Sequence, residues 1–377
     1  MGMPRKKPKS PPIMSHEFVI QNHADILACI AILIVLGLVA EITAKVSRVF
    51  VFLQHGFIKN EEGELEPAVG KDAFPIEFTR GYLDIFTVLF QAMMLIVVHA
   101  VIQEYIVDKV SKKLHLSKTK NSRFSESGQL LVWCIVAVGW SAHLIIKNGF
   151  FSNISALWED YPHTIIHWET KLYLLVQMAY WVHMYPELYF QKARKEEIPT
   201  RVRYYTLHLV FLAGAYALNF WRVSLIMGML HFTAEAVFHA SRLLYFAEKN
   251  ELAEMGFTIW RFVFPIVRLL ILAIGFLTFR LGLGRAEIQE VDFATGNFNS
   301  PFVRIVCLSS LFVLQVWLMW PYTQLIVRRR NEQEELKKKA AVLSTAKPKP
   351  VGKKQKKDGS FESTNGVGGK SGKLKKN

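Results

Sequence analysis

Ionisable and amide side chains inside long apolar segments are the part of this sequence best suited to chemistry. Placing such a group in the hydrocarbon core of a membrane costs about 2.5 to 3.5 kcal/mol on insertion scales, so each position is a candidate for function. These side chains can donate hydrogen bonds, move protons or hold water at membrane depth. We expect the following residues to form one polar wall inside the membrane: His99, Gln103, Glu104, His183, Glu187, His208, Asn219, His231 and Glu235.

The run HFTAEAVFHASR repeats ionisable residues with the period of a helix. It stacks His231, Glu235 and His239 on one face at i, i+4 and i+8. Two histidines and a carboxylate are a familiar metal-ligand set, and a His–Glu pair can also move a proton in lipid chemistry. The two histidines are, however, about 12 Å of helical rise apart. We therefore favour interhelical hydrogen bonding or the wall of a partly hydrated cavity, and we expect no catalytic residue, metal or cofactor.

The cysteines suggest no further chemistry. Cys29, Cys134 and Cys307 all fall inside apolar blocks, and the sequence has no CxxC motif. Neither a disulfide nor a cysteine-based zinc site is therefore expected.

Long apolar blocks must position these polar groups. A helix needs about 20 apolar residues to cross a hydrocarbon core of roughly 30 Å. The predicted spans are residues 26–44, 83–107, 130–146, 172–190, 204–221, 223–246, 260–279 and 302–327. The stretch 204–246 is too long for one span and is typical of a tight helical hairpin, broken around Asn219–Arg222. The predicted fold class is all-α, a polytopic membrane bundle of about eight transmembrane helices.

Small, charged and aromatic residues in these blocks predict how the helices pack. Gly214 and Gly228 are expected to let the two helices of the hairpin approach closely. Arg268 is expected to snorkel toward the membrane surface or to pair with a carboxylate. The aromatic residues between Tyr180 and Tyr205 are interpreted as anchors at the membrane interface.

Basic residues predict the topology. Lys and Arg are concentrated in alternate polar segments that include both ends of the chain, which places both termini in the cytosol. The acidic loop 61–66 and the glycosylation sequon at Asn153 then lie on the opposite, lumenal side. Asn153 is a glycosylation candidate, although it lies close to a span end.

The composition changes abruptly at Arg328. A basic cluster is followed by a charged, helix-forming stretch and a tail rich in Lys, Gly, Ser and Pro, which is expected to be disordered. The tail has two open interpretations: a topology determinant that also attracts anionic lipid, or a contact with ribosomal RNA. Lys373 and Lys375 resemble a cytosolic di-lysine retrieval signal, which favours the endoplasmic reticulum.

Three runs resemble the translocating chain-associated membrane protein family: SHEFVIQNHADIL, HAVIQEYIVDKVSKKLHLSKTKNSRFSESGQ and QMAYWVHMYPELYFQK. The resemblance covers the chain up to about Arg330. Residues from about 117 to 327 also resemble the TLC-type domain, which other protein families share. It implies an endoplasmic reticulum protein beside the Sec channel that helps signal sequences and transmembrane segments of nascent chains enter the lipid, and not an enzyme. The regions expected are a cytosolic segment 1–25, two helices with a lumenal loop in 26–116, a six-helix TLC-type domain in 117–327 and the tail 328–377.

Ceramide synthases share the TLC-type domain, and their motif allows a test at the level of residues. His208 lacks the neighbouring histidine of that motif, and Phe232 replaces the aspartate that follows the next histidine. A phenylalanine can neither accept a proton nor carry charge. The resemblance therefore argues against acyl transfer, and a lipid-handling role as acyltransferase or lipid sensor is kept as the alternative.

Overall fold

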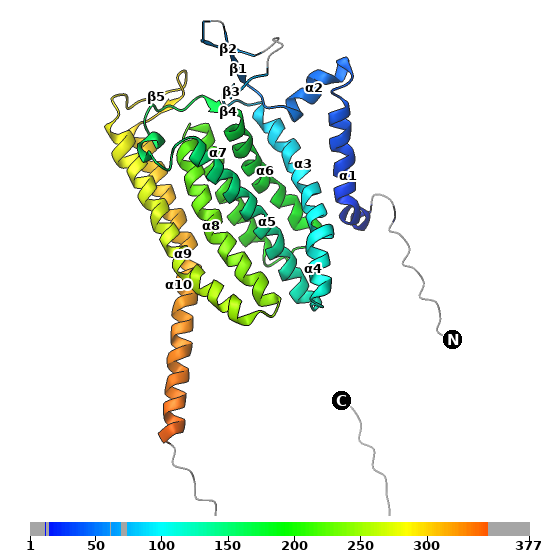
Figure 1. The fold of residues 1–377 in the computed structure, drawn as a ribbon, viewed down its shortest axis with the longest axis vertical. Helices are drawn as coiled ribbons and strands as arrows, with labels where there is room; N and C mark the ends of the chain where they lie inside the picture. Colours follow the sequence, from blue (N-terminus) through cyan, green and yellow to red (C-terminus); the bar gives the residue numbers. More distant parts are fainter. Residues whose placement is uncertain (1–11, 13–14, 61, 69–73, 346–377) are drawn as a thin grey trace, which may run out of the picture. The chain divides into compact units, whose positions relative to one another are not determined.

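Long helices dominate the structure (Figure 1). The computed structural model describes residues 12, 15–60, 62–68 and 74–345. Six helical segments in this part of the chain are long and apolar enough to cross a membrane: His16–Leu36, Asp84–Lys113, Lys118–Lys147, Trp221–Phe246, Asn250–Arg285 and Pro301–Ala341. The chain is thus a multi-pass helical membrane protein.

The helices within these segments have the following bounds. They are α1 (His16–Leu36), α3 (Asp84–Ile102), the π-helix η1 (Gln103–Val107), α4 (Asp108–Lys113), α5 (Lys118–Lys147), α8 (Trp221–Phe246), α9 (Asn250–Phe276), η3 (Leu277–Gly282), η4 (Leu283–Arg285) and α10 (Pro301–Thr345). Two further long helices, α6 (Trp168–Phe190) and α7 (Ile198–Ala217), run beside them but are more polar (Figure 1). The structure therefore shows six candidate spans and does not by itself confirm eight.

The first predicted span, 26–44, has wrong bounds. Helix α1 already begins at His16 and ends at Leu36, and a second helix, α2 (Glu41–Val51), follows after a turn. A Cβ atom at Gly37 would collide with the Ser47 hydroxyl, and the Thr43 hydroxyl donates a hydrogen bond of 2.7 Å to the Gly37 carbonyl. The side chains of α2 therefore pack onto the end of α1 and stop the helix early.

The predicted hairpin is confirmed. Helices α7 and α8 are separated only by residues 218–220, and Asn219 has a left-handed backbone with φ of 60°. Its side-chain amide is buried and donates a hydrogen bond of 2.8 Å to the Gly296 carbonyl. Asparagine tolerates this conformation better than most residues, so the polar break both ends α7 and ties the turn to a distant loop.

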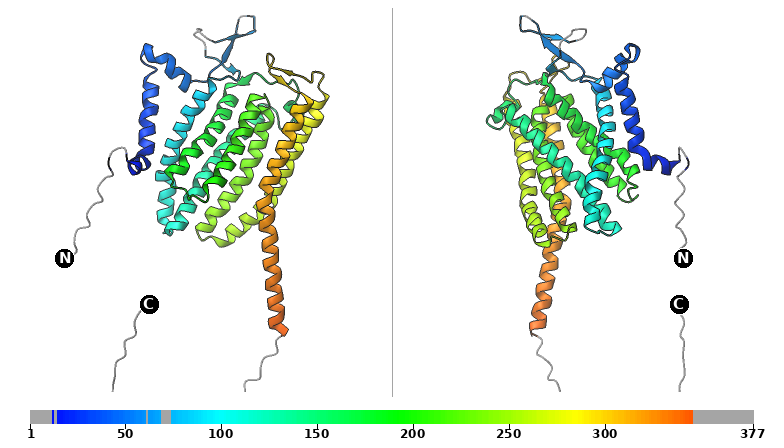
Figure 2. Two further views of the ribbon diagram at one scale, coloured as in Figure 1. Left: turned by 180° about the vertical axis from the view of Figure 1, so that it is seen from behind. Right: turned by 45° about the vertical axis from the view of Figure 1, so that its right-hand side comes forward.

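The most extensive helix contacts are those that α8 makes with α5 and α9. Helix α6 packs between α3 and α7. Helix α1 lies at the edge of the bundle against α3 (Figure 2). Only Ala31 of α1 is buried. Several polar residues of α6 and α8 are buried between helices, namely Gln177, His183, Glu187, His231 and His239.

A small antiparallel sheet covers one end of the bundle. Its strands, in spatial order, are β2 (Leu65–Pro67), β1 (Gly56–Lys59), β3 (Glu77–Phe78) and β4 (Ile166–His167). A separate two-stranded sheet consists of β5 (Val291–Asp292) and β6 (Asn297–Phe298), and η2 (Ile154–Leu157) is a single 3-10 turn. None of these strands is predicted from the sequence.

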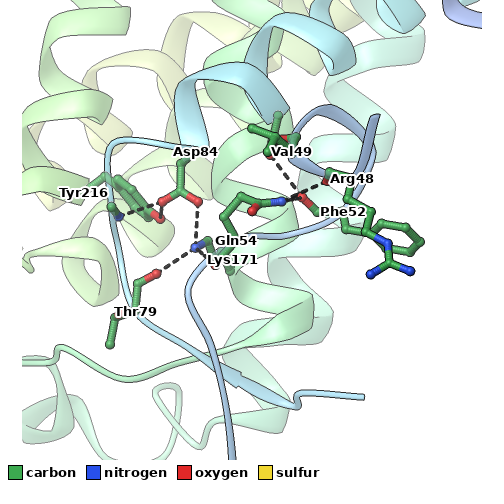
Figure 3. Close-up of polar contacts among 10 residues, drawn as sticks. Arg48, Val49, Phe52, Gln54, Thr79, Asp84, Lys171 and Tyr216 are labelled. Carbon is green, nitrogen blue, oxygen red and sulfur yellow. Dashed lines mark hydrogen bonds and ion pairs between the residues drawn. The ribbon is translucent and has the colours of Figure 1, made fainter. Parts of the chain in front are cut away.

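A buried ion pair lies beside the larger sheet (Figure 3). The Lys171 ammonium, fully inaccessible to solvent, lies 2.7 Å from an Asp84 oxygen and donates hydrogen bonds of 2.7 Å to the carbonyls of Gln54 and Thr79. The other Asp84 oxygen accepts a hydrogen bond of 2.8 Å from the Tyr216 hydroxyl. Every ammonium proton thus has an acceptor, and the cluster joins α3, α6, α7 and the sheet.

The same close-up shows how the chain leaves α2 (Figure 3). The Gln54 amide donates to the carbonyls of Arg48 and Phe52 at 2.9 and 2.7 Å. The Thr87 hydroxyl of α3 donates to the carbonyls of Val49 and Phe52. Carbonyls at a helix end lack partners within the helix, so these side chains satisfy them and hold α2 against α3.

Acid is expected to destabilise the loop before β4. His163 is buried there, with one ring nitrogen 2.7 Å from the Glu159 carbonyl, and burial together with the nearby Arg222 lowers its pKa to about 4. The unfolded chain, with a pKa of about 6.5, binds a proton that the native state does not. The free energy of unfolding should therefore fall as the pH drops from 6.5 to 4, by up to about 3 kcal/mol from this residue.

Thermal unfolding in detergent at a series of pH values tests this expectation. The variant His163→Gln keeps a donor for the Glu159 carbonyl but has no titrating ring, so its midpoint should depend less on pH over the same interval. Parallel pH curves for the two proteins would contradict the assignment.

Residues from Tyr322 onward form a separate unit. Helix α10 continues through the basic cluster to Thr345, with ion pairs at i, i+4 spacing such as Arg328–Glu332 at 2.9 Å. The helix predicted to follow Arg328 is thus confirmed. Lys373, Lys375 and the tail predicted to be disordered lie outside the described residues.

Candidate functional site

Two cavities lie inside the bundle and share Trp181, His231, Phe232 and Leu318 in their walls. The first, here called the apolar cavity, has a volume of about 390 Å³ and is lined mainly by aliphatic and aromatic residues of α6 to α10. The second, here called the polar cavity, has a volume of about 410 Å³ and is lined by residues of α3, α5, α6, α7, α8 and α10. His231 therefore stands at the boundary between an apolar and a polar compartment.

The hydrogen bonds of His231 fix its protonation. Both terminal nitrogens of the Arg268 guanidinium lie 3.1 Å from His231 Nδ1, and the Tyr204 hydroxyl lies 3.2 Å from Nε2. A guanidinium only donates, so Nδ1 accepts and the ring proton is on Nε2, from which it is donated to Tyr204. The ring is neutral and has no free lone pair, which leaves it unable to serve as a general base or a metal ligand in this state.

Arg268 joins α8, α9 and α10 at the centre of the site. Its side chain is 2% exposed, with the guanidinium 3.9 Å from a Glu235 oxygen, 3.5 Å from the Gln315 amide oxygen and 4.6 Å from the Phe264 ring. Of the two outcomes predicted for Arg268, pairing with a carboxylate is therefore the correct one. The Glu235 carboxylate also lies 3.7 Å from His239 Nε2.

Aromatic rings surround His208. Its ring stacks on Trp181 at 4.6 Å and lies 4.3 Å from Tyr204 and 4.8 Å from His231, while Nδ1 donates to the Tyr204 carbonyl at 2.8 Å. Trp181, Tyr180 and Tyr205 are buried. For these three residues the interpretation as interface anchors is thus wrong, because helix packing buries them, whereas Tyr189 near the end of α6 is 45% exposed.

A second polar group joins α3 to α6. His99 Nε2 lies 3.9 Å from a Glu187 oxygen, and the Gln191 amide nitrogen lies within 3.2 Å of His99 and 3.0 Å of the same carboxylate. The buried His183 ring lies 6.0 Å from that of His99. Gln103, at the start of η1, accepts a hydrogen bond of 3.2 Å from the side-chain amide of Gln129 of α5. His99 and Gln129 both line the polar cavity.

The residues of the predicted wall form two hydrogen-bonded groups, and two of its proposed members belong to neither. His99 of one group and His231 and Glu235 of the other line the same polar cavity. Glu104 is exposed, because it directly follows Gln103 and adjacent helical residues face different directions. Asn219 lies in the turn between α7 and α8, where its amide holds Gly296. The other residues divide into His208, His231 and Glu235 in one group and His99, Gln103, His183 and Glu187 in the other.

The expected close contact between the hairpin glycines is also wrong. A Cβ atom placed on Gly214 or Gly228 would meet no described heavy atom within 4 Å apart from its chain neighbours and the nearby backbone of its own helix. Both glycines instead line the apolar cavity. Their missing side chains leave space between α7 and α8 rather than bringing the helices together.

Two other candidate sites can be located. Asn153 is exposed, and its side-chain oxygen accepts hydrogen bonds from the Ser155 amide and hydroxyl at 3.2 and 2.6 Å. Its glycosylation stays a prediction. Among the residues described, no group of three or more His, Cys, Asp or Glu side chains is placed to hold a metal ion.

Comparisons with known proteins place this geometry in context. The family model described as the TLC domain matches residues 123–324. The mouse translocating chain-associated membrane protein 2 is 40% identical to the chain over 98% of it and 99% of the relative, and the human protein of the same name is 42% identical over 87% and 86%. The sphingosine N-acyltransferase lac1 of Schizosaccharomyces pombe is 23% identical over 40% of each chain.

Proposed function

Because the chain belongs to the translocating chain-associated membrane protein family and contains a TLC domain, we propose that it is a non-enzymatic accessory of the endoplasmic reticulum translocon. In this role it assists the co-translational translocation and membrane insertion of signal sequences and transmembrane segments. Its partners are the Sec channel, nascent chains and membrane lipids, with the basic tail as a further contact to the ribosome. The names and full-length similarity of the mouse and human relatives support the proposal.

The proposal includes a topology of eight spans with both termini in the cytosol. Helices α6 and α7 would be the two polar spans, since they run beside the six apolar ones (Figure 1). The ends of α5 and α7 that carry Glu126 and Arg201, which pair at 2.9 Å, would then face the cytosol. The polar cavity, which both residues line, would begin at the side from which nascent chains arrive.

The polar cavity is the observation that carries the function. It brings Glu126, Glu235, His99 and His239 together between membrane helices. A signal sequence must move from an aqueous channel into lipid together with its polar flanks, and uncompensated polar groups in hydrocarbon are costly. A hydrated cavity beside the channel would offer hydrogen bonds at intermediate depth and would lower that cost.

Acyl transfer of the ceramide synthase kind is disfavoured by the same geometry. His231 uses both ring nitrogens for Arg268 and Tyr204, so no lone pair is left to accept a substrate proton. Phe232 packs into a buried aromatic and aliphatic cluster where a catalytic carboxylate would be needed. The more distant lac1 relative matches only part of the chain.

Removal of the interior carboxylates should weaken insertion of weakly hydrophobic signals. The double variant Glu187→Leu, Glu235→Leu removes one charge from each polar group, whereas Glu104→Leu makes the same change at an exposed position. We expect the double variant to lower insertion roughly fivefold, equivalent to ~1 kcal/mol, and the single variant to have little effect. The measurement is insertion of a marginal signal sequence into vesicles reconstituted with the Sec channel and each variant.

Equal insertion with wild type and the double variant, both shown to be folded by gel filtration, would exclude this mechanism.

Crosslinking gives an independent test of contact between the polar cavity and signal sequences. A photoreactive residue at Trp133, which lines the polar cavity, should capture ribosome-bound signal sequences, whereas one at the outward-facing Ile135 of the same helix should capture fewer.

A further inference from the structure

The apolar cavity results from the sequence of the α7–α8 hairpin, because two glycines stand where side chains would fill it. Gly214 of α7 and Gly228 of α8 both line it. Apart from the nearby chain of its own helix, neither position has a described heavy atom within 4 Å of where a Cβ would lie. Larger residues at these two positions would fill the space without a clash. A close-packed interior normally leaves few voids larger than a water molecule, so a cavity of about 390 Å³ calls for an occupant.

The cavity adjoins the outer surface of the bundle between α7 and α10. Val210 of α7 is 60% exposed and Val306 of α10 is 45% exposed, yet both also line the cavity. Helices α7 and α10 share little close backbone contact. In a bilayer this side faces lipid, so an apolar molecule can reach the cavity from the membrane without crossing water.

Part of the cavity wall is polar and incompletely satisfied. His208, Arg268 and Gln315 line this part, and Arg268 Nε is buried with no hydrogen-bond partner among the described residues. A buried donor left without an acceptor costs about 1 to 3 kcal/mol, so an occupant that brings an acceptor would be favoured.

Size and polarity select among possible occupants. A 20-residue helix about 10 Å wide and 30 Å long fills on the order of 2,000 Å³, so a signal-sequence helix does not fit. Water is disfavoured along most of the wall, because buried water needs two to four polar partners. A single extended hydrocarbon chain matches both the apolar walls and the volume.

We propose that the apolar cavity holds one acyl chain from the bilayer, with a carboxylate or ester carbonyl at its polar end near Arg268. The inference rests on the cavity alone and goes beyond the translocon role. It requires no bond making or breaking, and the neutral, fully hydrogen-bonded His231 is consistent with a ligand that is held and not converted.

Cavity-filling variants test the proposal directly. Purified full-length protein, delipidated in detergent, is titrated with tritiated palmitic acid, and bound label is counted after rapid gel filtration. We expect about one palmitate per chain for wild type and roughly tenfold weaker binding, ~1.4 kcal/mol, for Gly228→Leu. Gly139→Leu is the matched control, since Gly139 of α5 is exposed, also has no heavy atom near its missing Cβ and does not line the cavity.

Binding that is absent in wild type, or equal in Gly228→Leu and Gly139→Leu, would overturn the proposal. If Gly228→Leu fails to fold, Gly214→Leu gives the same test from the opposite helix. Native mass spectrometry of protein taken from vesicles of palmitoyl-oleoyl phosphatidylcholine with added palmitic acid then identifies the source. Retention of a mass equal to palmitic acid assigns a free fatty acid, and retention of the phospholipid mass assigns a bilayer lipid.

Discussion

Replacing Lys171 with methionine is expected to lower the free energy of unfolding by about 3 to 5 kcal/mol. The ammonium is fully buried, and it lies 2.7 Å from Asp84 and from two backbone carbonyls (Figure 3). Methionine has a similar length but no charge, so the Asp84 carboxylate and both carbonyls would be left buried without this partner. Leaving one member of a buried ion pair uncompensated costs far more than the pair itself contributes.

Unfolding in mixed detergent and SDS micelles gives the measurement, and Lys147→Met is the matched control. Lys147 is 43% exposed and pairs with Glu169 at 2.6 Å, so the same substitution there should leave stability unchanged within error. The double variant Lys171→Met, Asp84→Asn should recover part of the loss, because it removes the orphaned charge. A Lys171→Met protein as stable as the control would refute the role assigned to this cluster.

Replacing Arg268 with leucine should cost about 3 kcal/mol of stability and also disturb both cavities. The guanidinium contacts His231 of α8 and Gln315 of α10 and lies near Glu235, so its loss leaves polar groups on two neighbouring helices without a partner. His231 would also lose the donor that holds its Nδ1, which frees its ring to rotate. The boundary between the cavities should therefore loosen.

The rescue experiment separates charge from packing. Adding Glu235→Gln to Arg268→Leu removes the orphaned carboxylate and should restore part of the unfolding free energy, whereas a purely steric role predicts no rescue. Arg280→Leu, at an exposed position of η3, is the control and should behave like wild type. No difference between Arg268→Leu and Arg280→Leu would show that the buried arginine is dispensable.

The helices were largely predictable from the sequence because apolar runs and polar breaks are local properties. The hairpin between α7 and α8 follows from a polar break in a stretch too long for one span. The stripe of His231, Glu235 and His239 predicts interhelical hydrogen bonds or a cavity wall: His231 accepts a hydrogen bond from Arg268 of α9, and all three residues line the polar cavity. The distant contacts of these residues, such as Tyr204 to His231, depend on which helices are neighbours.

Features that depend on tertiary contact could not be predicted. The end of α1 is set by Ser47 meeting Gly37, and no periodicity shows this. Lys171 and Asp84 lie at the edges of apolar segments, where charged residues are ordinarily solvated, so nothing in their local context marks a buried pair. Gly214 and Gly228 have the composition of a packing face, and only the positions of α9 and α10 show that they border a cavity.

The position of Lys171 in the chain also determines when its contacts can form during synthesis of the protein. The lysine is 92 residues downstream of the Thr79 carbonyl that it binds and 117 downstream of that of Gln54. At a synthesis rate of about 5 to 20 residues per second, the first of these intervals lasts roughly 5 to 18 s. During that period α3 is already made, but Asp84 has no lysine partner. The ion pair that joins α3 to α6 can therefore form only after α6 has been synthesised.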